Sequence, residues 1–304
     1  MTTASTTTSV AQTGEAASRV GMLGVGLMGS AMAHRLLNEG VEVVAWDRDP
    51  GHVGALGQRG ANIASSAGDV VSSADVVITM LPTAEIVLSV LEPLLPQWPE
   101  TTIWLQMSSV GAAESDQLAK VAAANDVILF DAPVSGSTHP AEEGKLTILA
   151  SGPDSERTRV EPVLAALGSR VLWVGEAGMG SRLKLAANHW MITAVTALAE
   201  TMHLCELMGL DHQQFITLLD GSPLGSTYGL QKLDEMDRHE YPAGFPVRLA
   251  VKDLELVREV ANSAHVEAPL LDAVLERMTE ISRSHADDDL AAVYELRLDS
   301  DARG

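Results

Sequence analysis

Short apolar runs alternate with amphipathic stretches over the first half of the chain. The runs lie at residues 19–23, 41–46, 74–80, 102–105, 127–130, 146–150 and 170–174. Helical patterns separate several of them, for example Ala31 to Asn38 and Glu156 to Leu167. Apolar runs this short, with helical segments between them, are typical of the buried strands of a parallel sheet. This half of the chain therefore predicts a doubly wound α/β domain of Rossmann type.

The pattern changes after Met179, and no strand signal follows. Ser181 to Met208 keeps a helical pattern throughout, and a helix of that length spans roughly 40 Å. Further helical patterns lie at 212–220, 224–238, 247–264, 269–284 and 289–298. We therefore expect a disordered tail at 1–18, a Rossmann-type domain at 19–179 and an all-helical domain at 180–304. The long helix is expected to join the two domains.

Composition narrows the class of protein. The chain has 304 residues, a net charge of −21 and a single cysteine, Cys205. This negative charge argues against nucleic acid or an anionic membrane as a partner, because both require a basic face. No apolar run reaches the roughly 18 residues of a membrane span, and residues 1–18 lack the apolar core of a signal peptide. A lone cysteine excludes an internal disulfide and a cysteine-rich metal site, so we expect a cytoplasmic protein without a bound metal.

The first apolar run leads into a glycine-rich turn, Gly24-Val25-Gly26-Leu27-Met28-Gly29. A strand precedes this turn, and a helix and a second strand follow it. Glycines at this spacing permit a tight turn and close approach of the backbone to a pyrophosphate, which the helix N-terminus attracts. The alternative is a glycine turn of purely structural use. The context favours a dinucleotide site formed by Gly24, Gly26, Leu27, Met28 and Gly29.

The second strand ends at Asp47, followed by Arg48. A carboxylate at this place can bind the adenosine ribose hydroxyls and repel a 2′-phosphate, which favours NAD over NADP. Arg48 could instead pair with that phosphate, stack on adenine or remain a solvated surface charge. The cofactor is therefore predicted as NAD or NADP, with NAD favoured by Asp47.

Other polar or turn residues follow later strands. Leu81, Pro82 and Ser108 come at strand ends, where such folds place the cofactor. Residues 131–138 form a turn that contains Ser135, Gly136 and Ser137, and its hydroxyl and backbone N–H groups are able to hold a carboxylate. An ordinary polar loop is the simpler interpretation of this turn when it is considered alone.

The long helix begins with Gly180-Ser181-Arg182-Leu183-Lys184 and continues to Asn188. Residues four apart share a face of a helix, so Lys184 and Asn188 present a cation and an amide to the same space. That arrangement suits proton transfer. Most helical lysines are solvated surface charges, however, so this segment alone does not predict a site.

Four segments together resemble the β-hydroxyacid dehydrogenase family, which includes 3-hydroxyisobutyrate dehydrogenase, over residues 19–297. They are the glycine turn with its continuation to Ala33, Asp131 to Gly136, Gly180 to Asn188, and Val251-Lys252-Asp253-Leu254. The resemblance implies that Lys184 is the general acid/base and that Asn188 helps to hold the substrate. It also implies that the loop of Ser135 and Gly136 grips the substrate carboxylate and that Lys252 lies near the nicotinamide.

The chain departs from the family pattern in two places. Ser137 stands where many relatives have a second glycine, and Gln106-Met107-Ser108-Ser109 lacks an aspartate that many relatives carry before the Ser-Thr pair. Ser137 is expected to narrow the substrate loop. His139, His189 and Trp190 are further candidates to line the pocket, although both histidines are more often surface or packing residues.

The sequence thus predicts an NAD(P)-dependent oxidoreductase that interconverts a small β-hydroxy acid and its semialdehyde or keto acid, with its active site between the two domains. Ser135, Lys184 and Asn188 are the predicted catalytic residues. One alternative is an imine reductase or reductive aminase, which usually carries Asp or Tyr at the position of Lys184. A second is a nucleotide-binding module without catalysis. The family also implies a homodimer or homotetramer.

Overall fold

A computed structural model describes residues 19–297; the tail expected at 1–18 lies outside this range. The chain divides into two compact units, Met1–Lys184 and Leu185–Gly304. The division falls inside one helix, five residues after the boundary expected from the sequence. Among the described residues, no helix is long and apolar enough to cross a membrane.

The first unit is built around a parallel sheet of six strands in the order β3-β2-β1-β4-β5-β6. The strands are β1 (Arg19–Leu23), β2 (Glu42–Trp46), β3 (Asn62–Ile63), β4 (Val76–Thr79), β5 (Ile103–Gln106) and β6 (Ile128–Asp131). Chain order reverses direction beside β1, which makes the carboxyl ends of β1 and β4 the topological switch point. The predicted doubly wound Rossmann-type domain is confirmed.

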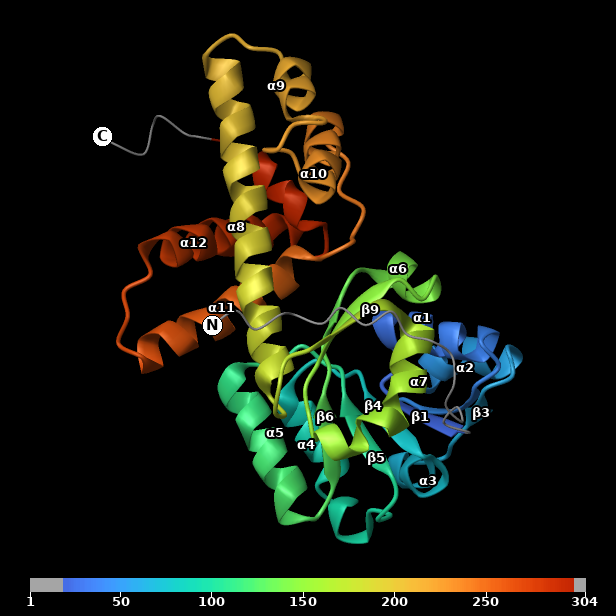
Figure 1. Ribbon diagram of the computed structural model, residues 1–304. Coiled ribbons are helices and arrows are strands. Elements are labelled where there is room, and N and C mark those ends of the chain that lie inside the picture. The colour runs from blue at the N-terminus through green and yellow to red at the C-terminus, as the bar shows by residue number, and fades with distance from the viewer. Residues whose placement is uncertain (1–18, 298–304) are drawn as a thin grey trace. The chain divides into compact units, whose positions relative to one another are not determined.

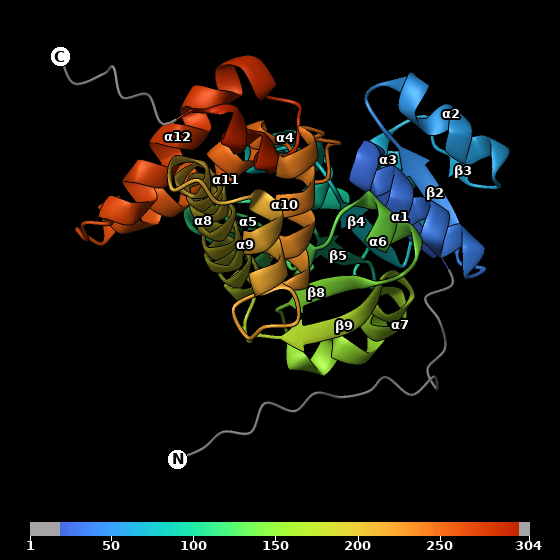
Figure 2. The same ribbon diagram turned by 90° about the horizontal axis from the view of Figure 1, so that it is seen from above.

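Helices cover both faces of this sheet (Figures 1 and 2). They are α1 (Leu27–Asn38), α2 (Pro50–Gln58), α3 (Ala67–Ser73), α4 (Ala84–Leu91), α5 (Ala112–Ala124), α6 (Thr138–Glu142) and α7 (Arg157–Leu167), with short 3-10 turns at η1 (Leu95–Gln97) and η2 (Asp154–Glu156). Alternate residues of each strand face opposite sides, so Val76 and Ile78 join the core under α1, α2 and α7, while Val77 joins the core under α3, α4 and α5.

The last two predicted strands of this unit belong to a different sheet. β7 (Val134–Ser135), β8 (Leu146–Ala150) and β9 (Gly168–Trp173) form a separate sheet of three strands. β7 runs antiparallel to β8, and β9 runs parallel to it. Paired backbone hydrogen bonds between Asp131 and Ser151, of 2.9 and 2.8 Å, connect the ends of β6 and β8. The apolar runs were predicted correctly as strands, but the sequence did not indicate that the last two lie in a second sheet.

The second unit is helical. Its helices are α8 (Met179–Leu207, which starts in the first unit), α9 (His212–Leu219), α10 (Thr227–Arg238), α11 (Val247–Ser263) and α12 (Pro269–His285). The predicted last helix at 289–298 is instead a 3-10 turn, η3 (Leu290–Glu295). Asp289 caps this turn by accepting the N–H of Ala291 at 3.0 Å. The same carboxylate accepts the N–H groups of Gly244 and Phe245 and pairs with buried Lys232 at 2.8 Å, which fixes the end of the chain to α10.

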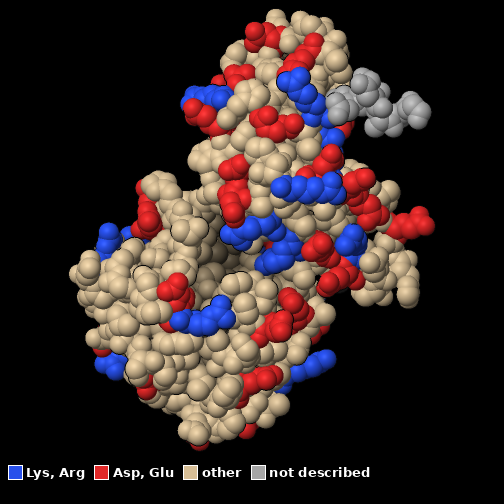
Figure 3. Space-filling view, turned by 180° about the vertical axis from the view of Figure 1, so that it is seen from behind, with Lys and Arg blue, Asp and Glu red and all other residues tan. Residues whose placement is uncertain are grey.

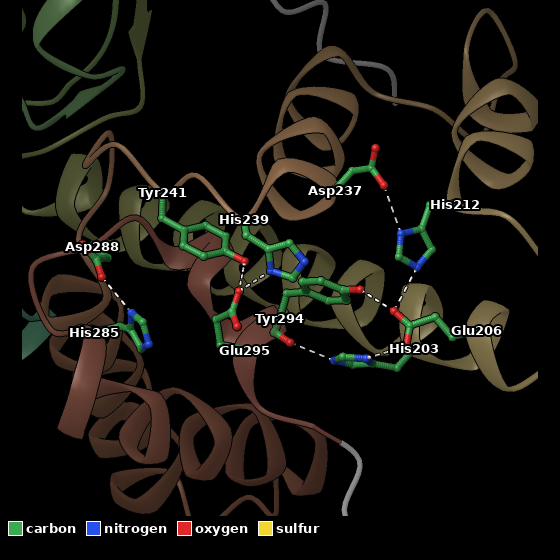
Figure 4. A network of polar contacts seen from close by, with 10 residues as sticks. All are labelled: His203, Glu206, His212, Asp237, His239, Tyr241, His285, Asp288, Tyr294 and Glu295. Atoms are coloured by element: carbon green, nitrogen blue, oxygen red, sulfur yellow. Dashed lines mark hydrogen bonds and ion pairs between the residues drawn. The ribbon is translucent and has the colours of Figure 1, made fainter.

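A polar network connects the C-terminal end of α8 to η3, α9 and α10 (Figure 4). Glu206 accepts the Tyr294 hydroxyl at 2.5 Å and lies 3.1 Å from His212 Nε2. His212 Nδ1 in turn lies 3.0 Å from Asp237. The Tyr294 hydroxyl, followed by the nearby His203 and His212, holds the pKa of Glu206 below its usual range although burial acts in the opposite direction.

This lowered pKa predicts a stability that depends on pH. The Glu206 contacts stabilise the unit above the ordinary glutamate range, near pH 4.3, and the stabilisation is lost as pH falls through the lowered pKa of the folded state. Glu206→Gln should reduce the free energy of unfolding at pH 7 by about 0.5–1 kcal/mol, a small effect because the side chain is half exposed. Urea denaturation at pH 7 and pH 3 measures this effect, with exposed Glu200→Gln as control. A difference as large at pH 3 as at pH 7 would contradict the assignment.

Candidate active site

The glycine turn leaves open space where its helix begins. A Cβ on Gly24, whose φ is +95°, would lie 2.3 Å from the Met80 carbonyl oxygen, and one on Gly29 would lie 2.1 Å from the Gly24 oxygen. A Cβ on Gly26 would meet nothing within 4 Å. Gly24 and Gly29 are therefore required for the fold of the turn, while Gly26 keeps the space above the first turn of α1 clear. Leu27 beside it is 79% exposed, which is unusual for leucine.

Asp47 supports this turn from below. Its Oδ2 accepts the Val25 N–H at 2.7 Å and its Oδ1 accepts the Asp49 N–H at 2.9 Å. His52 Nδ1 lies 3.3 Å from the same Oδ1. Burial raises the pKa of Asp47, but the two backbone donors and His52 outweigh it, so the pKa lies below its usual value. Asp47 is thus an anion that holds the glycine turn in shape, with Arg48 exposed beside it.

The residues after β4 and β5 complete this edge of the sheet. Ser108 is buried, and its hydroxyl accepts the Leu81 N–H at 2.9 Å and donates to the Thr79 oxygen at 3.2 Å. Leu81 is half-buried and Pro82 is exposed. The Ser108 hydroxyl therefore holds the Leu81 turn in place from inside the protein.

This set of groups fits a nicotinamide dinucleotide. The open space at Gly26 lies at the N-terminus of α1, where unpaired N–H groups and the helix dipole attract a pyrophosphate. The site also lies at the topological switch point of the sheet, where dinucleotides bind in folds of this kind.

The loop predicted to hold a carboxylate, at residues 131–138, contains the short strand β7. Ser135 and Gly136 are exposed, and Ser137 is half-buried at the start of α6. Gly136 has a φ of +132°, and a Cβ there would lie 2.9 Å from Leu146 and 3.3 Å from Pro140. The backbone of this loop therefore requires glycine at 136, and the hydroxyl of Ser135 is accessible.

The start of α8 is fixed to the first unit by a buried carboxylate that sequence analysis did not assign. Asp131 is 2% exposed; its Oδ2 accepts the Ser181 N–H at 2.8 Å and its Oδ1 accepts the Ser181 hydroxyl at 2.7 Å. Gly180 donates its N–H to the Ser151 hydroxyl at 3.0 Å. A Cβ on Gly180 would lie 2.2 Å from the Leu149 oxygen, so the helix starts in direct contact with the strands.

Charge and solvation oppose each other at Asp131. Burial raises the pKa of this carboxyl, and the donors from Ser181 and Ser151 only partly offset that effect.

A second contact holds the start of α8 one residue further along the chain. Arg182 makes a bidentate ion pair with Asp116 of α5 at 2.9 and 2.8 Å. Lys184, half-buried and the last residue of the first unit, lies two residues beyond this anchor.

In the second unit, Asn188 is held by another buried aspartate. Its Nδ2 donates to Oδ2 of Asp253 at 2.5 Å, and both residues are 2% exposed. Lys252 Nζ lies 3.6 Å from the other oxygen of Asp253. The amide of Asn188 is therefore oriented by α11. Asp253 could have been suspected from the sequence, because it falls among the inward positions Ala250 and Leu254 of an amphipathic helix.

The remaining candidates lie apart from these contacts. His139 is exposed beside Glu143, 3.6 Å away. The His189 ring lies 3.5 Å from the Thr193 hydroxyl on the same helix. Trp190 is 66% exposed, on a face of α8 that differs from the face of Lys184 and Asn188.

Family models match nearly all of the described chain. Residues 19–175 match the NAD binding domain of 6-phosphogluconate dehydrogenase, and residues 178–297 match the model described as NAD-binding of NADP-dependent 3-hydroxyisobutyrate dehydrogenase. Both halves thus point to one group of nicotinamide-dependent enzymes.

Individual proteins agree with these models. The chain is 32% identical to 2-(hydroxymethyl)glutarate dehydrogenase of Eubacterium barkeri, over 83% of this chain and 85% of that protein. It is 30% identical to glyoxylate/succinic semialdehyde reductase 1 of Arabidopsis thaliana, over 91% and 97% of the two chains. The solved structure of Mycobacterium tuberculosis 3-hydroxyisobutyrate dehydrogenase with L-serine superposes with a TM-score of 0.86 at 26% identity, covering 92% of this chain and 98% of that one.

The chain belongs to the β-hydroxyacid dehydrogenase family. Within that family it is an NAD(P)-dependent dehydrogenase of the 3-hydroxyisobutyrate dehydrogenase type, which interconverts a hydroxy acid and its carbonyl form by hydride transfer.

The Asp131 anchor generates a prediction. Asp131→Ala removes both acceptors of Ser181 and should lower kcat about a hundredfold, since a misplacement near 1 Å costs that much, while cofactor affinity changes little. Asp131→Asn should retain most activity, because the Ser181 hydroxyl can turn to accept from the new amide while the Ser181 N–H donates to its oxygen.

Steady-state kinetics and cofactor titration of the folded variants measure these effects. Asp116→Ala serves as the control, because its ion pair with Arg182 is partly exposed and should contribute little. Equal losses from Asp116→Ala and Asp131→Ala would argue against a special role for the buried carboxylate.

Proposed function

We propose that Lys184 is the general acid/base for a small β-hydroxy acid and its semialdehyde or keto acid. The supporting observation is the Asp131–Ser181 anchor, which holds the first turn of α8, and Lys184 within one further turn, against the strand ends of the cofactor-binding unit. The relatives named above are dehydrogenases or reductases of small carboxylates. The carboxylate of the substrate is proposed to lie against Ser135, Gly136 and Ser137.

The residues divide the chemistry between them. A bound nicotinamide supplies hydride to the carbonyl carbon or accepts it from the alcohol carbon. As negative charge develops on the oxygen, the ammonium of Lys184 stabilises it and then donates the proton; in the reverse direction the neutral amine removes the proton. We propose that the carbonyl oxygen of Asn188, whose Nδ2 donates to Asp253, accepts a hydrogen bond from the substrate hydroxyl. Lys252 is proposed to lie near the nicotinamide.

This role is tested by removing the amine. Lys184→Ala should lower kcat by about three orders of magnitude, at the upper range of general acid/base contributions, with cofactor affinity nearly unchanged. Lys120→Ala, at an exposed lysine of α5, is the matched control. The assay is a panel of small hydroxy acids and their carbonyl forms with both cofactors, and it includes a cyclic imine. Turnover of the imine alone would favour the imine reductase alternative, and unchanged turnover in Lys184→Ala would reject the proposed role.

The proposed cofactor is NAD, with NADP also accepted. The Asp47 carboxylate is anionic and repels a 2′-phosphate, whereas the exposed guanidinium of Arg48 beside it can pair with one. In this proposal the Asp47 side chain both holds the glycine turn in shape and repels a 2′-phosphate.

Two substitutions separate these effects. Asp47→Asn keeps one acceptor for the turn but removes the charge, so the ratio of NADP to NAD affinity should rise about tenfold, equivalent to about 1.4 kcal/mol. Arg48→Ala should lower the same ratio. Isothermal titration with each cofactor measures both ratios, and an unchanged ratio in Asp47→Asn would contradict the repulsive role.

We further propose a cytoplasmic homodimer or homotetramer. A dehydrogenase must share a compartment with the reactions that regenerate its nicotinamide. On the face drawn in Figure 3, acidic and basic side chains are interspersed, and this mixture suits a small charged substrate better than nucleic acid or an anionic membrane. Exposed large apolar residues near the C-terminal end of α8, among them Leu207 and Met208, support self-association.

A further inference from the structure

His52 lies in the first turn of α2, beside the end of β2 where the adenosine ribose of the cofactor is proposed to bind. Its Nδ1 lies 3.3 Å from Oδ1 of Asp47, and its Nε2 lies 3.9 Å from Oδ2 of Asp49. The backbone N–H of His52 donates to the Asp49 carbonyl oxygen at 3.1 Å, which holds the residue next to the cap of α2. The side chain is 50% exposed, so a bound ligand can reach the ring.

The two ring nitrogens of His52 have different surroundings. Nδ1 faces the anionic Asp47 at contact distance, which assigns the single N–H of the neutral ring to Nδ1. Nε2 is too far from Asp49 for a hydrogen bond. The neutral ring therefore presents a lone pair at Nε2, which repels a phosphate oxygen. The protonated ring presents a positively charged N–H donor there, which binds one.

The elements that pack against α2 are α1, β2 and β3, and β3 carries no charged residue. The charged side chains of α1 and β2 interact with groups other than His52. Their contacts are Arg35 with Glu39, His34 with Arg59 and Glu142, and Glu42 with Arg19.

The charges at the end of β2 are therefore those of Asp47, Arg48 and Asp49, which sum to −1. Protonation of His52 brings this sum to 0, so a single proton removes the net negative charge that a 2′-phosphate would meet. The pKa of Asp47 lies below its usual value, and a guanidinium stays charged at all ordinary pH values. Histidine changes its charge between pH 5 and 8, where these neighbours do not.

We infer that His52 makes the choice between NAD and NADP depend on pH: its protonated ring pairs with the 2′-phosphate of NADP, and its neutral ring favours NAD. This inference rests on the cofactor site proposed above and adds to it a specificity-determining residue beyond Asp47 and Arg48. Because NAD lacks the 2′-phosphate, the ratio of the two affinities isolates this contact from every group that touches both cofactors.

Isothermal titration with NAD and NADP at pH 6.5 and pH 8.5 tests the role of His52. In the wild type the ratio of NADP to NAD affinity should be about fivefold higher at pH 6.5, the upper range for a partly exposed ion pair. A phosphate monoester itself takes up a proton at about pH 6, which acts in the opposite direction. In His52→Gln, where only the phosphate titrates, the ratio should be unchanged or slightly lower at pH 6.5.

A permanent charge tests the same contact in the other direction. His52→Lys should raise the ratio at pH 8.5 to about the wild-type value at pH 6.5, and the rise on acidification should disappear. Exposed His265→Asn is the control and should behave as the wild type, since asparagine tolerates the positive φ of 55° at that position.

Two kinds of failure are distinguishable. An equal rise at pH 6.5 in the wild type and His52→Gln, or no rise in the wild type, overturns the role of His52 and leaves the Asp47 and Lys184 proposals intact. Failure of the wild type to bind either cofactor overturns the proposed cofactor site together with this inference.

Discussion

The pair of hydrogen bonds from Ser181 to the Asp131 carboxylate is the contact on which the site depends. A carboxylate buried this deeply must find donors, since desolvation of an unpaired charge costs several kcal/mol. Both donors belong to one residue in the first turn of α8. The strand end therefore determines where the helix starts, and the helix determines where Lys184 lies relative to the glycine turn. Gly180 permits this contact because it presents no side chain to the Leu149 oxygen.

The same physical solution recurs at three other aspartates. Asp47 collects backbone N–H groups under the glycine turn, Asp253 orients the amide of Asn188, and Asp289 gathers backbone donors and the ammonium of Lys232. In each case a carboxylate with little exposure fixes groups from segments distant in sequence. Some of the acidic residues of this chain therefore have a structural function inside the fold, and only the others add negative charge to its surface.

Local pattern was enough to predict most of the elements. Five of the six parallel strands, the glycine turn and the extent of α8 follow from apolar periodicity and turn residues, which act over a few positions. The sixth strand, β3 (Asn62–Ile63), has only two residues, both exposed, and carries no apolar run from which it could be predicted. The second sheet could not be predicted in this way. The apolar run of β8 would have the same sequence pattern in either sheet, and which strands it pairs with depends on contacts between residues distant in sequence. The final turn was misjudged for a related reason: Asp289 and its distant donors override a weak helical pattern.

The sequence could not predict how the side chains of the site are oriented. Asp47 was expected to face a ribose, and its position at the strand end was right, but the sequence could not show that both of its oxygens accept N–H groups of the protein. Asp131 and Asp253 both lie in segments that carry the family resemblance, but the sequence assigned no role to either. An aspartate is identified as buried and structural by the donors around it, and the fold brings those donors together from distant parts of the chain. The ribose contact of Asp47 stays a prediction.

The absence of space around Gly180 affects how a saturation mutagenesis map of this enzyme should be interpreted. Any side chain there must displace α8 from the strands, so every substitution would be scored as inactive although Gly180 takes part in no chemical step. When no substitution is tolerated at such a position, the loss of activity shows that a helix must pack closely at that point. The sites that report chemistry are those where a close isostere of the natural side chain fails while the fold survives.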